Sequence, residues 1–473
     1  MLSAPGFRAW LAANASKITY AALSAAAFVM LFLHADSQPF WADELCQITF
    51  SGTTGSLGQT VFYDPHTPPL YDAALYLWYK VAPYGERWLL LLSEGAFAIA
   101  VFVTGLVGER IRNRRTGILA ATLLALNGSA ILTCGWELRP QAFMLLFCVL
   151  ALYEWVERAK KPGFSALRML RYAAWMVLSG YAHYFGVLFC GMLFLMDFYL
   201  VCRKRIALRY LLSYGLAGVY LPWLRVALRH DTAGLWQPTP TPQGLLELLQ
   251  FLGGENWLIL GLFVLAIVFI FKRKPFVERA PVFVVCVMIL LVYVYGRYIA
   301  WRSTFWVARY FSALFPCMMI ACALTLDTVL QGILRRKRKV AAAVCVCLML
   351  YTGWNTVRVI QNEKPAPYRA AAEWLYAQGD IMFEPDTIVI SSDGGWPLDG
   401  WREYYITKQG RREPILLVDA WIVEADVLLY FGRVYHSTYG YWGLPGKLRQ
   451  VLDEHYVLLE ENEELYIKVY ERR

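Results

Sequence analysis

Two adjacent carboxylates, Asp43 and Glu44, lie in the stretch FWADELCQITF (residues 40–50), directly after the first long apolar run of the chain. A carboxylate in partly apolar surroundings can accept a proton from a hydroxyl group, which is the task of a general base. Acidic residues also flank many membrane helices as solvated ends, and Asp36 has that character. The pair is therefore either a candidate catalytic site or the solvated end of a membrane helix.

A second group of candidates combines basic and aromatic side chains at the ends of apolar segments. A guanidinium group can bind a phosphate through two parallel hydrogen bonds, and an imidazole can donate to an anion. Each has an ordinary alternative, such as a rigid surface turn, a lipid headgroup contact or a salt bridge between helices. The residues are His66 in DPHTPPLY (64–71), Glu137 and Arg139 in CGWELRPQAF (134–143), His183 and Tyr184 in GYAHYFG (180–186), and Arg309 and Tyr310 in VARYFSALFP (307–316).

The composition is that of an integral membrane protein. Of the 473 residues, 58% are hydrophobic and only 17% are charged, whereas soluble proteins have about 25% charged residues. The ten cysteines form no CxxC pair or Cys/His cluster, which indicates core packing rather than disulfides or zinc ligands. The net charge of +9 comes from short basic blocks between apolar runs. This placement predicts cytoplasmic loops rather than nucleic-acid binding.

Membrane-spanning helices need about 20 apolar residues. The segment 172–202 is too long for one span, and both of its flanks are basic. By the positive-inside rule both flanks lie on the cytoplasmic side, so this segment must cross twice and turn near His183. The chain is then predicted to have about eleven spans: 17–35, 87–107, 116–134, 140–157, two within 172–202, 210–227, 256–271, 281–296, 305–329 and 340–357.

The same rule predicts the orientation of the chain. Arg8 and Lys17 precede the first span, so the N-terminus is expected in the cytoplasm. An odd number of spans then places the C-terminus outside, in a multi-pass protein of the cytoplasmic membrane. The first span is expected to be retained, because ADSQPFWADE is a poor signal-peptide cleavage site. Three segments face outward in this topology: 36–86, 228–255 and the residues after about 358.

Two of the outward segments have structure of their own. LYDAALYLWYKVA (70–82) has the apolar spacing of a helix that lies in the membrane interface. Residues 359–473 are charged and alternate a helix-like PYRAAAEWLYAQ with strand-like DTIVISS, PILLVDA, DVLLYFG and EELYIKVYE. The sequence thus predicts a transmembrane catalytic domain, 1–358, and a small extracytoplasmic α/β domain, 359–473. It contains no glycine-rich nucleotide-binding motif.

The ordered set WADE, HTPPLY, ELRPQAF, AHYFG and ARYF resembles the polyprenyl-phosphate-sugar-dependent glycosyltransferases of the GT-C fold. The branch that it resembles contains the bacterial relatives of protein O-mannosyltransferases and of the lipid A aminoarabinose transferase. Residues 112–156 are similar to one long stretch of that family, and the resemblance covers about residues 1–330. Each motif is weak alone, but their order and their common outward side make the combination specific.

The resemblance implies inverting transfer of one hexose or pentose unit from a polyprenyl-phosphate donor to a lipid, glycan or protein acceptor outside the membrane. It places the general base on Asp43, with Glu44 as a second carboxylate, and donor-phosphate contact on Arg139. His183, Arg309 and Tyr310 match residues of the same cavity. No cofactor is certain, and a divalent cation on the two carboxylates stays open, because hard cations prefer about six oxygen ligands.

Two departures from the family pattern loosen any inference about the particular sugar. The outer-turn arginine is followed by Pro140 rather than by tyrosine, and Asn127–Gly128 stands where relatives often have proline. An oligosaccharide ligase or polymerase is the alternative enzyme, for which the outward segment 228–255 is short. A lipid flippase or transporter would need ionisable residues near the bilayer midplane and an internal repeat. Residues 391–405 of the tail are expected to form either an acceptor-guiding lid or an ordinary aromatic turn.

Overall fold

The structure, a computed structural model, describes residues 4–37, 39–63, 67–161, 163–229, 237–270, 275–300, 303–334, 337–363, 367–392, 395–414, 417–437 and 444–473. It divides into two compact units. We call the first the helical unit; it contains Met1–Leu33, Asp64–Tyr71 and Leu90–Glu363. The second, the mixed unit, contains His34–Tyr63, Asp72–Leu89 and Lys364–Arg473. Most of the first outward segment therefore belongs to the same unit as the C-terminal tail.

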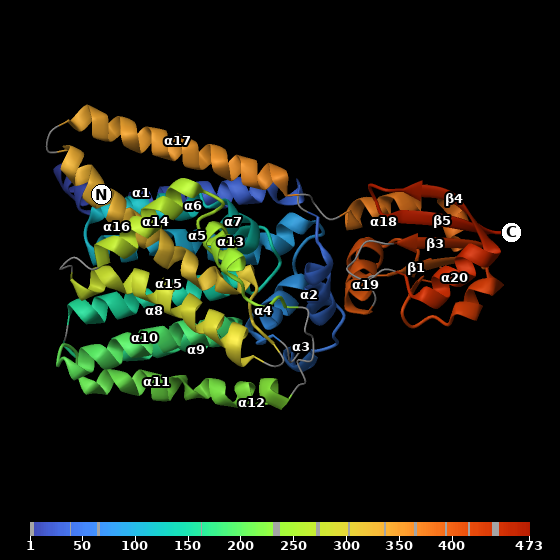
Figure 1. Cartoon of the computed structure of the whole chain (residues 1–473), viewed down its shortest axis with the longest axis horizontal. Coiled ribbons are helices and arrows are strands. Elements are labelled where there is room, and N and C mark those ends of the chain that lie inside the picture. Colours follow the sequence, from blue (N-terminus) through green and yellow to red (C-terminus); the bar gives the residue numbers. More distant parts are fainter. Residues whose placement is uncertain are drawn as a thin grey trace. The chain divides into compact units, whose positions relative to one another are not determined.

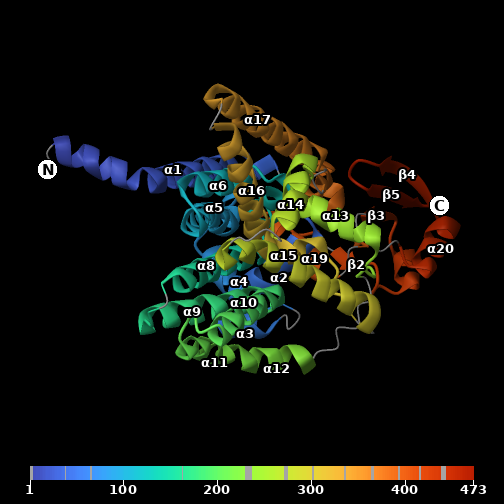
Figure 2. The same ribbon diagram turned by 60° about the vertical axis from the view of Figure 1, so that its left-hand side comes forward.

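Long helices make up the helical unit, and α8, α9 and α10 lie side by side (Figures 1 and 2). Within the described ranges, six helices are long and apolar enough to cross a membrane, or eight if each of two bent helix pairs is one span. The predicted polytopic helical fold is confirmed, while the number of eleven crossings stays a prediction. The helices that fall in the predicted spans are α1 (Ala4–His34), α5 (Glu86–Ile111), α6 (Arg114–Ala125) with α7 (Gly128–Ala130), α8 (Gln141–Lys160), α9 (Ala166–Ala182), α10 (Tyr184–Cys202), α11 (Leu212–Leu216) with α12 (Leu221–Arg229), α14 (Trp257–Ile270), α15 (Phe276–Val294), α16 (Phe315–Leu334) and α17 (Arg338–Asn362).

Two breaks in these helices have clear side-chain causes. The chain bends by 61° between α6 and the segment that starts with α7. There Asn127 accepts a hydrogen bond from the Ala130 amide (2.9 Å) and donates to the Leu252 carbonyl (2.9 Å). Asparagine thus caps the new helix at this break. The predicted turn at His183 is confirmed, because α9 ends at Ala182 and α10 begins at Tyr184.

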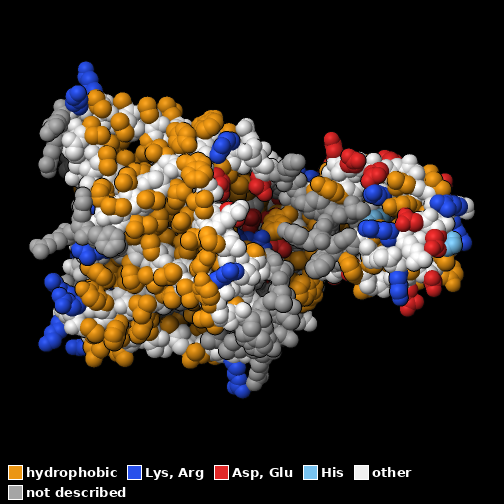
Figure 3. All heavy atoms as spheres, viewed as in Figure 1, with side chains coloured by type: hydrophobic (Ala, Val, Ile, Leu, Met, Phe, Trp, Pro, Cys, Tyr) orange, Lys and Arg blue, Asp and Glu red, His pale blue; other side chains and the backbone are white. Residues whose placement is uncertain are grey.

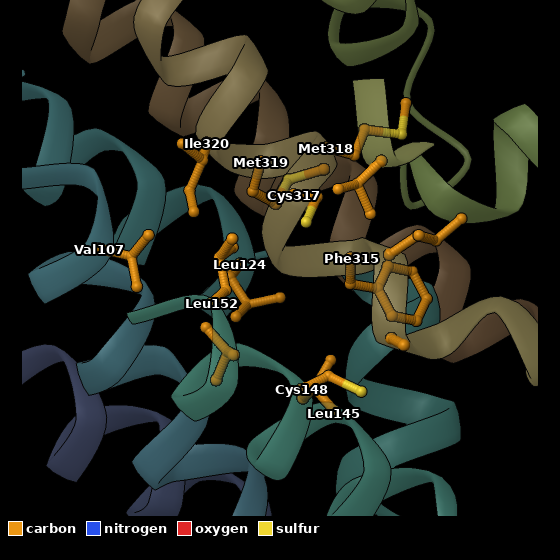
Figure 4. Close-up of a cluster of buried hydrophobic side chains, with 14 of the residues drawn as sticks. Val107, Leu124, Leu145, Cys148, Leu152, Phe315, Cys317, Met318, Met319 and Ile320 are labelled. Carbon is orange, nitrogen blue, oxygen red and sulfur yellow. The ribbon is translucent and has the colours of Figure 1, made fainter. Parts of the chain in front are cut away.

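The core of the helical unit surrounds α16, which is the most buried of the six candidate spans. Its side chains Phe315, Cys317 and Met319 meet Leu124 of α6 and Cys148 of α8 (Figure 4). Outside the core, hydrophobic side chains cover the flank of the helices, and Lys and Arg side chains lie toward the helix ends (Figure 3). This distribution fits a protein whose flank contacts lipid.

A buried ion pair joins α8 to α10. Arg158 and Asp197 are 1% and 0% exposed, and the Asp197 carboxylate accepts hydrogen bonds from Arg158 and from the Tyr214 hydroxyl (2.6 Å). The guanidinium of Arg158 also lies 3.9 Å from the centre of the Tyr172 ring. Removing one partner of such a pair leaves a buried charge without its counter-ion.

We expect Asp197→Ala to lower the free energy of unfolding by about 3–5 kcal/mol, measured by denaturant unfolding in detergent micelles. The control is Glu157→Ala, which breaks the partly exposed pair of Glu157 with Arg110 (2.7 Å). Exposed pairs contribute about 0–1 kcal/mol. Equal losses in the two variants would contradict a stabilising role of the buried pair.

A five-stranded sheet forms the centre of the C-terminal part of the mixed unit. The strand order is β2 (Leu417–Asp419), β1 (Thr387–Ser391), β3 (Arg433–Ser437), β5 (Ile467–Arg472), β4 (Tyr456–Asn462). The first three strands are parallel, with Val389 opposite Leu417 and Tyr435, and β5 is antiparallel to β3 and β4. Three helices accompany the sheet: α18 (Tyr368–Ala377), α19 (Gly395–Arg402) and α20 (Gly446–His455). The predicted small sheet in the tail is therefore present.

One strand prediction is wrong. DVLLYFG was expected to be a strand, but Ala425–Tyr430 forms a short 3-10 helix, η9, and β3 begins only at Arg433. Leu428 is fully buried, whereas Tyr430, two residues later, is 80% exposed. In a strand, side chains two residues apart lie on the same face. The burial of Leu428 and the exposure of Tyr430 therefore do not fit a half-buried strand.

The first outward segment contains three helices: α2 (Ala42–Gly52), α3 (Leu57–Tyr63) and α4 (Leu70–Tyr79). In α4 and the turn after it, Leu77 and Val81 are 57% and 71% exposed, whereas Tyr71 and Leu75 are buried. The helix expected within 70–82 is present. Of its predicted apolar face, Leu77 and Val81 are exposed, whereas Leu70, Ala74 and Trp78 are half-buried. Such a face suits a helix that lies in the membrane interface.

Candidate active site

The two adjacent carboxylates lie in the first turn of α2 and have different surroundings. Glu44 is 3% exposed, and its carboxylate accepts a hydrogen bond from the backbone amide of Trp41 (3.1 Å). This is the carboxylate half of a capping box, so Glu44 fixes the start of the helix. Asp43 is half-buried beside it.

Arg139 belongs to the helical unit and lies in the turn between the π-helical segment η2 (Ile131–Gly135) and α8. The indole of Trp136 anchors this turn by donating to the Leu31 carbonyl (3.0 Å). Pro140 is the residue directly before α8, and its ring fixes the backbone φ angle there (−66°). The turn holds Arg139 at 9% exposure, so its charge lies in a poorly hydrated place.

Arg309 and Tyr310 lie on a 3-10 segment, η6 (Ala308–Leu314), which packs against η2, α8 and α10. The Ser312 hydroxyl donates to the Arg309 carbonyl (2.5 Å) and closes this turn. The ring of Tyr310 lies 5.0 Å from the ring of His183, centre to centre. The segment therefore brings residues from near position 310 to the break at His183.

His183 is 5% exposed in the turn between α9 and α10 and caps the latter helix. Burial and the guanidinium charges of Arg139 and Arg309 together lower the pKa of His183 to about 3. The imidazole is therefore neutral at physiological pH. Its Nδ1 accepts a hydrogen bond from the Phe185 amide (3.2 Å), so the proton of the neutral ring is on Nε2. The Nε2–H group can donate to an anion.

The electrostatics of this part of the helical unit suit a phosphate. Arg139 lies two residues before the first residue of α8, and His183 directly precedes the first residue of α10. Both helix ends carry a partial positive charge, and two guanidinium groups act on the same imidazole. Helix N-termini and arginines are the usual protein groups that bind phosphate oxygens.

Four of the predicted site residues thus come together within the helical unit: Arg139, His183, Arg309 and Tyr310. Glu137 is half-buried in the same turn as Arg139, and Tyr184 follows His183 with its ring centre 6.5 Å from the imidazole. His66 lies outside the described residues. No group of three or more His, Cys, Asp or Glu side chains that could hold a metal ion occurs among the residues that the structure covers.

Two buried polar residues were missed in the sequence analysis. Gln141 is 0% exposed at the first position of α8, and both atoms of its amide group lack a hydrogen-bond partner within the described part of the chain. Glu94 is 0% exposed in α5. Both could have been found, since an amide or a carboxylate inside an apolar run of a membrane protein is a candidate functional residue. Gln141 is two residues from Arg139 and is a candidate phosphate ligand.

The neutral state of His183 predicts a pH effect on stability. Below about pH 6.5 the unfolded chain binds a proton at this imidazole that the folded chain does not bind, so folding becomes less favourable as the pH falls. The loss is about 1.4 kcal/mol per pH unit below 6.5. We expect the wild type to lose about 1 kcal/mol more than His183→Gln between pH 7.5 and 5.5, measured by denaturant unfolding in detergent. Equal losses would show that the pKa of His183 is the same in the folded and unfolded chains.

Comparison with known proteins identifies the fold. No protein-family model matches the chain, and no curated protein matches it in sequence. Solved structures do match. ArnT from Cupriavidus metallidurans in the apo state has a TM-score of 0.61 at 14% identity, over 95% of this chain and 96% of that one. ArnT bound to undecaprenyl phosphate has a TM-score of 0.59 at 12% identity, over 95% and 97%.

A third match is the archaeal oligosaccharyltransferase AglB from Archaeoglobus fulgidus, in complex with an inhibitory peptide and a dolichol-phosphate. It has a TM-score of 0.55 at 12% identity, over 95% of this chain and 74% of that one. ArnT is a lipid A aminoarabinose transferase, and both proteins are GT-C glycosyltransferases. The chain has their fold, which confirms the fold implied by the sequence motifs.

Proposed function

We propose that this GT-C-fold chain is an inverting glycosyltransferase that moves a single sugar from a polyprenyl-phosphate donor to an acceptor on the extracytoplasmic side of the membrane. The observation that carries the proposal is the convergence of Arg139 and Arg309 on the neutral His183, beside the N-terminal ends of α8 and α10. This arrangement concentrates phosphate-binding groups in a membrane protein. The fold match to ArnT bound to undecaprenyl phosphate supports a lipid-phosphate ligand.

In this reaction Asp43 takes the proton from the acceptor hydroxyl or amine while the acceptor atom attacks the anomeric carbon of the sugar. The bond between this carbon and the phosphate oxygen breaks, and its electron pair leaves with the phosphate. Attack from the face opposite the phosphate inverts the anomeric configuration, through a transition state with oxocarbenium character. The products are the glycosylated acceptor and the polyprenyl phosphate.

Negative charge grows on the leaving phosphate in the transition state. Arg139 and Arg309 stabilise it as fixed cations, and His183 donates its Nε2–H. Because these groups are held before the donor binds, they need little reorganisation during the reaction. Glu44 keeps the first turn of α2 in place through its bond to Trp41. A divalent cation on Asp43 and Glu44 stays open, because hard cations prefer about six oxygen ligands, and every step above is assigned to side chains of the chain itself.

The test uses the purified full-length chain in nanodiscs with a labelled polyprenyl-phosphate sugar and an extract of envelope glycolipids and glycans. We expect label to move to an acceptor, and NMR of the product to show the inverted anomer. Absence of transfer from several monosaccharide donors would overturn the proposal.

The fold match to AglB favours one second candidate, which is transfer of an oligosaccharide. A parallel reaction with a lipid-linked oligosaccharide separates the two. Transfer of the oligosaccharide alone would replace the single-sugar proposal. Vesicles that are loaded with the donor on one side test the transporter alternative, since a flippase would equilibrate the donor without forming a product.

A further inference from the structure

The helix α2, which carries Asp43, is held by residues from the C-terminal part of the mixed unit. It packs against α19 so closely that the two backbones touch. A Cβ atom added to Gly400 would lie 2.0 Å from the Leu45 carbonyl oxygen and 2.6 Å from the Leu45 carbonyl carbon. Only glycine fits at this position, because the atoms it meets are backbone atoms that cannot rotate away.

Side chains on the same face strengthen this contact. The Thr49 hydroxyl of α2 donates to the Trp396 carbonyl at the start of α19 (2.5 Å). The rings of Phe50 and Trp396 pack edge to face, with their centres 5.0 Å apart. Thr49 and Phe50 are 1% and 3% exposed. The contact between α2 and α19 is thus specific and buried on the α2 side, while Trp396 at its edge is 42% exposed.

Hydrogen bonds from the C-terminal part of the chain also hold the residues before and after α2. Glu86, which is 5% exposed, accepts hydrogen bonds from Arg369 Nε of α18 (2.8 Å) and from the Tyr405 hydroxyl (3.0 Å). Arg369 also donates to the backbone carbonyl of Asp36 (2.9 Å). Asp36 precedes α2 and Glu86 follows it. The C-terminal part therefore fixes the two ends of the segment that contains the proposed base.

We propose that the C-terminal part of the chain positions Asp43 for catalysis, with Gly400 and Arg369 as positioning residues. This inference rests on the proposed function. An isolated helix of 11 residues such as α2 is marginally stable in water, so its place depends on what it packs against. A catalytic group has to be held within about 0.5 Å of its productive position. The contacts with α19 and Arg369 supply this constraint.

The first experiment compares Gly400→Ala with Gly446→Ala. Gly446 is the matched control, because a Cβ there has no atom within 4 Å and lies in the same unit. We expect Gly400→Ala to lower kcat for sugar transfer by about 10–100-fold with the donor KM within twofold, since a displacement of about 1 Å has such an effect on rate. Deuterium uptake of residues 42–52 should rise in Gly400→Ala, and Gly446→Ala should match the wild type in both measurements.

The second experiment uses Arg369 and stays informative if Gly400→Ala does not fold. We expect Arg369→Ala to lower kcat by about tenfold, again with little change in the donor KM. Arg369→Lys should recover part of the loss, because it keeps the charge beside Glu86 and loses the planar hydrogen-bonding fork. Arg433→Ala is the control, since it removes an exposed ion pair with Glu471 (2.9 Å) in the same unit.

The outcomes separate this inference from the proposed function. If Asp43→Asn is inactive while Gly400→Ala and Arg369→Ala keep wild-type kcat and wild-type deuterium uptake, the positioning role is wrong and the assignment of the base stands. If the wild type transfers no sugar, or if Asp43→Asn is fully active, the proposed function or its base is wrong. In that case, increased uptake in residues 42–52 of Gly400→Ala would show that α19 holds the helix without a role for Asp43.

Discussion

Asp43→Asn is expected to lower kcat for sugar transfer by about 10²–10⁴-fold and to leave donor binding unchanged. Asparagine has the same size as aspartate, but it cannot take the proton from the acceptor, and the contribution of a general base is of this magnitude. The measurements are single-turnover transfer of label from a polyprenyl-phosphate sugar and the donor Kd from a binding titration. Asp426→Asn serves as the control, because it makes the same change at an exposed position of the same unit.

Glu44 provides a contrast within the same helical turn. Glutamine can replace glutamate in a capping box, since its side-chain oxygen also accepts a hydrogen bond from the backbone amide. Glu44→Gln should therefore keep kcat within about tenfold of the wild type if Glu44 acts by holding the turn at Trp41. An inactive Glu44→Gln beside an active Asp43→Asn would exchange the roles of the two carboxylates.

Arg139→Gln is expected to reduce kcat/KM for the donor by about 10²–10³-fold, because it removes one fixed cation from the leaving phosphate. Arg139→Lys should recover only part of this loss, since lysine cannot form two parallel hydrogen bonds. The measurement is initial rate against donor concentration in nanodiscs. Arg168→Gln is the control; it changes an arginine of the helical unit whose Nη1 contacts the Lys161 carbonyl (3.4 Å).

Arg309 allows a double-variant test of whether the two arginines bind the same phosphate. If Arg139 and Arg309 bind one phosphate, their effects on the activation free energy, calculated from kcat/KM, should not be additive. The change in the double variant should then differ from the sum of the changes in the two single variants, as expected for residues that share a partner. Strict additivity would mean that the two arginines act at separate places. A donor that lacks the phosphate charge should show no difference between the wild type and either variant.

The residues of the helical unit were the most predictable part of the molecule. Apolar runs of about 20 residues are a local signal, and the basic blocks add the side of the membrane to which each loop belongs. This was enough to expect Arg139, His183 and Arg309 at one boundary, and the structure brings them together. The turn at His183 followed from the same rule, because two basic flanks require an even number of crossings.

The organisation of the mixed unit could not be predicted from the sequence. Thr49 and Trp396 are 347 residues apart along the chain, and neither lies in a motif that indicates its partner. Gly400 is one of several glycines in an aromatic segment, and only the close approach of the Leu45 backbone shows why it is needed. The cap formed by Glu44 was also hidden, since Trp41 stands where a capping box has serine or threonine.

The order in which the ribosome makes the chain gives the mixed unit a further property. Residues 34–89 are synthesised early, but the residues that pack against them begin only at position 364. At about 5–20 residues per second the first segment waits for roughly 15–60 s before its partner is available. During this time α2 is a short helix without α19. The two halves of the unit must therefore join after most of the membrane helices have been inserted. The part of the chain that contains the proposed base, Asp43, is thus completed last during assembly.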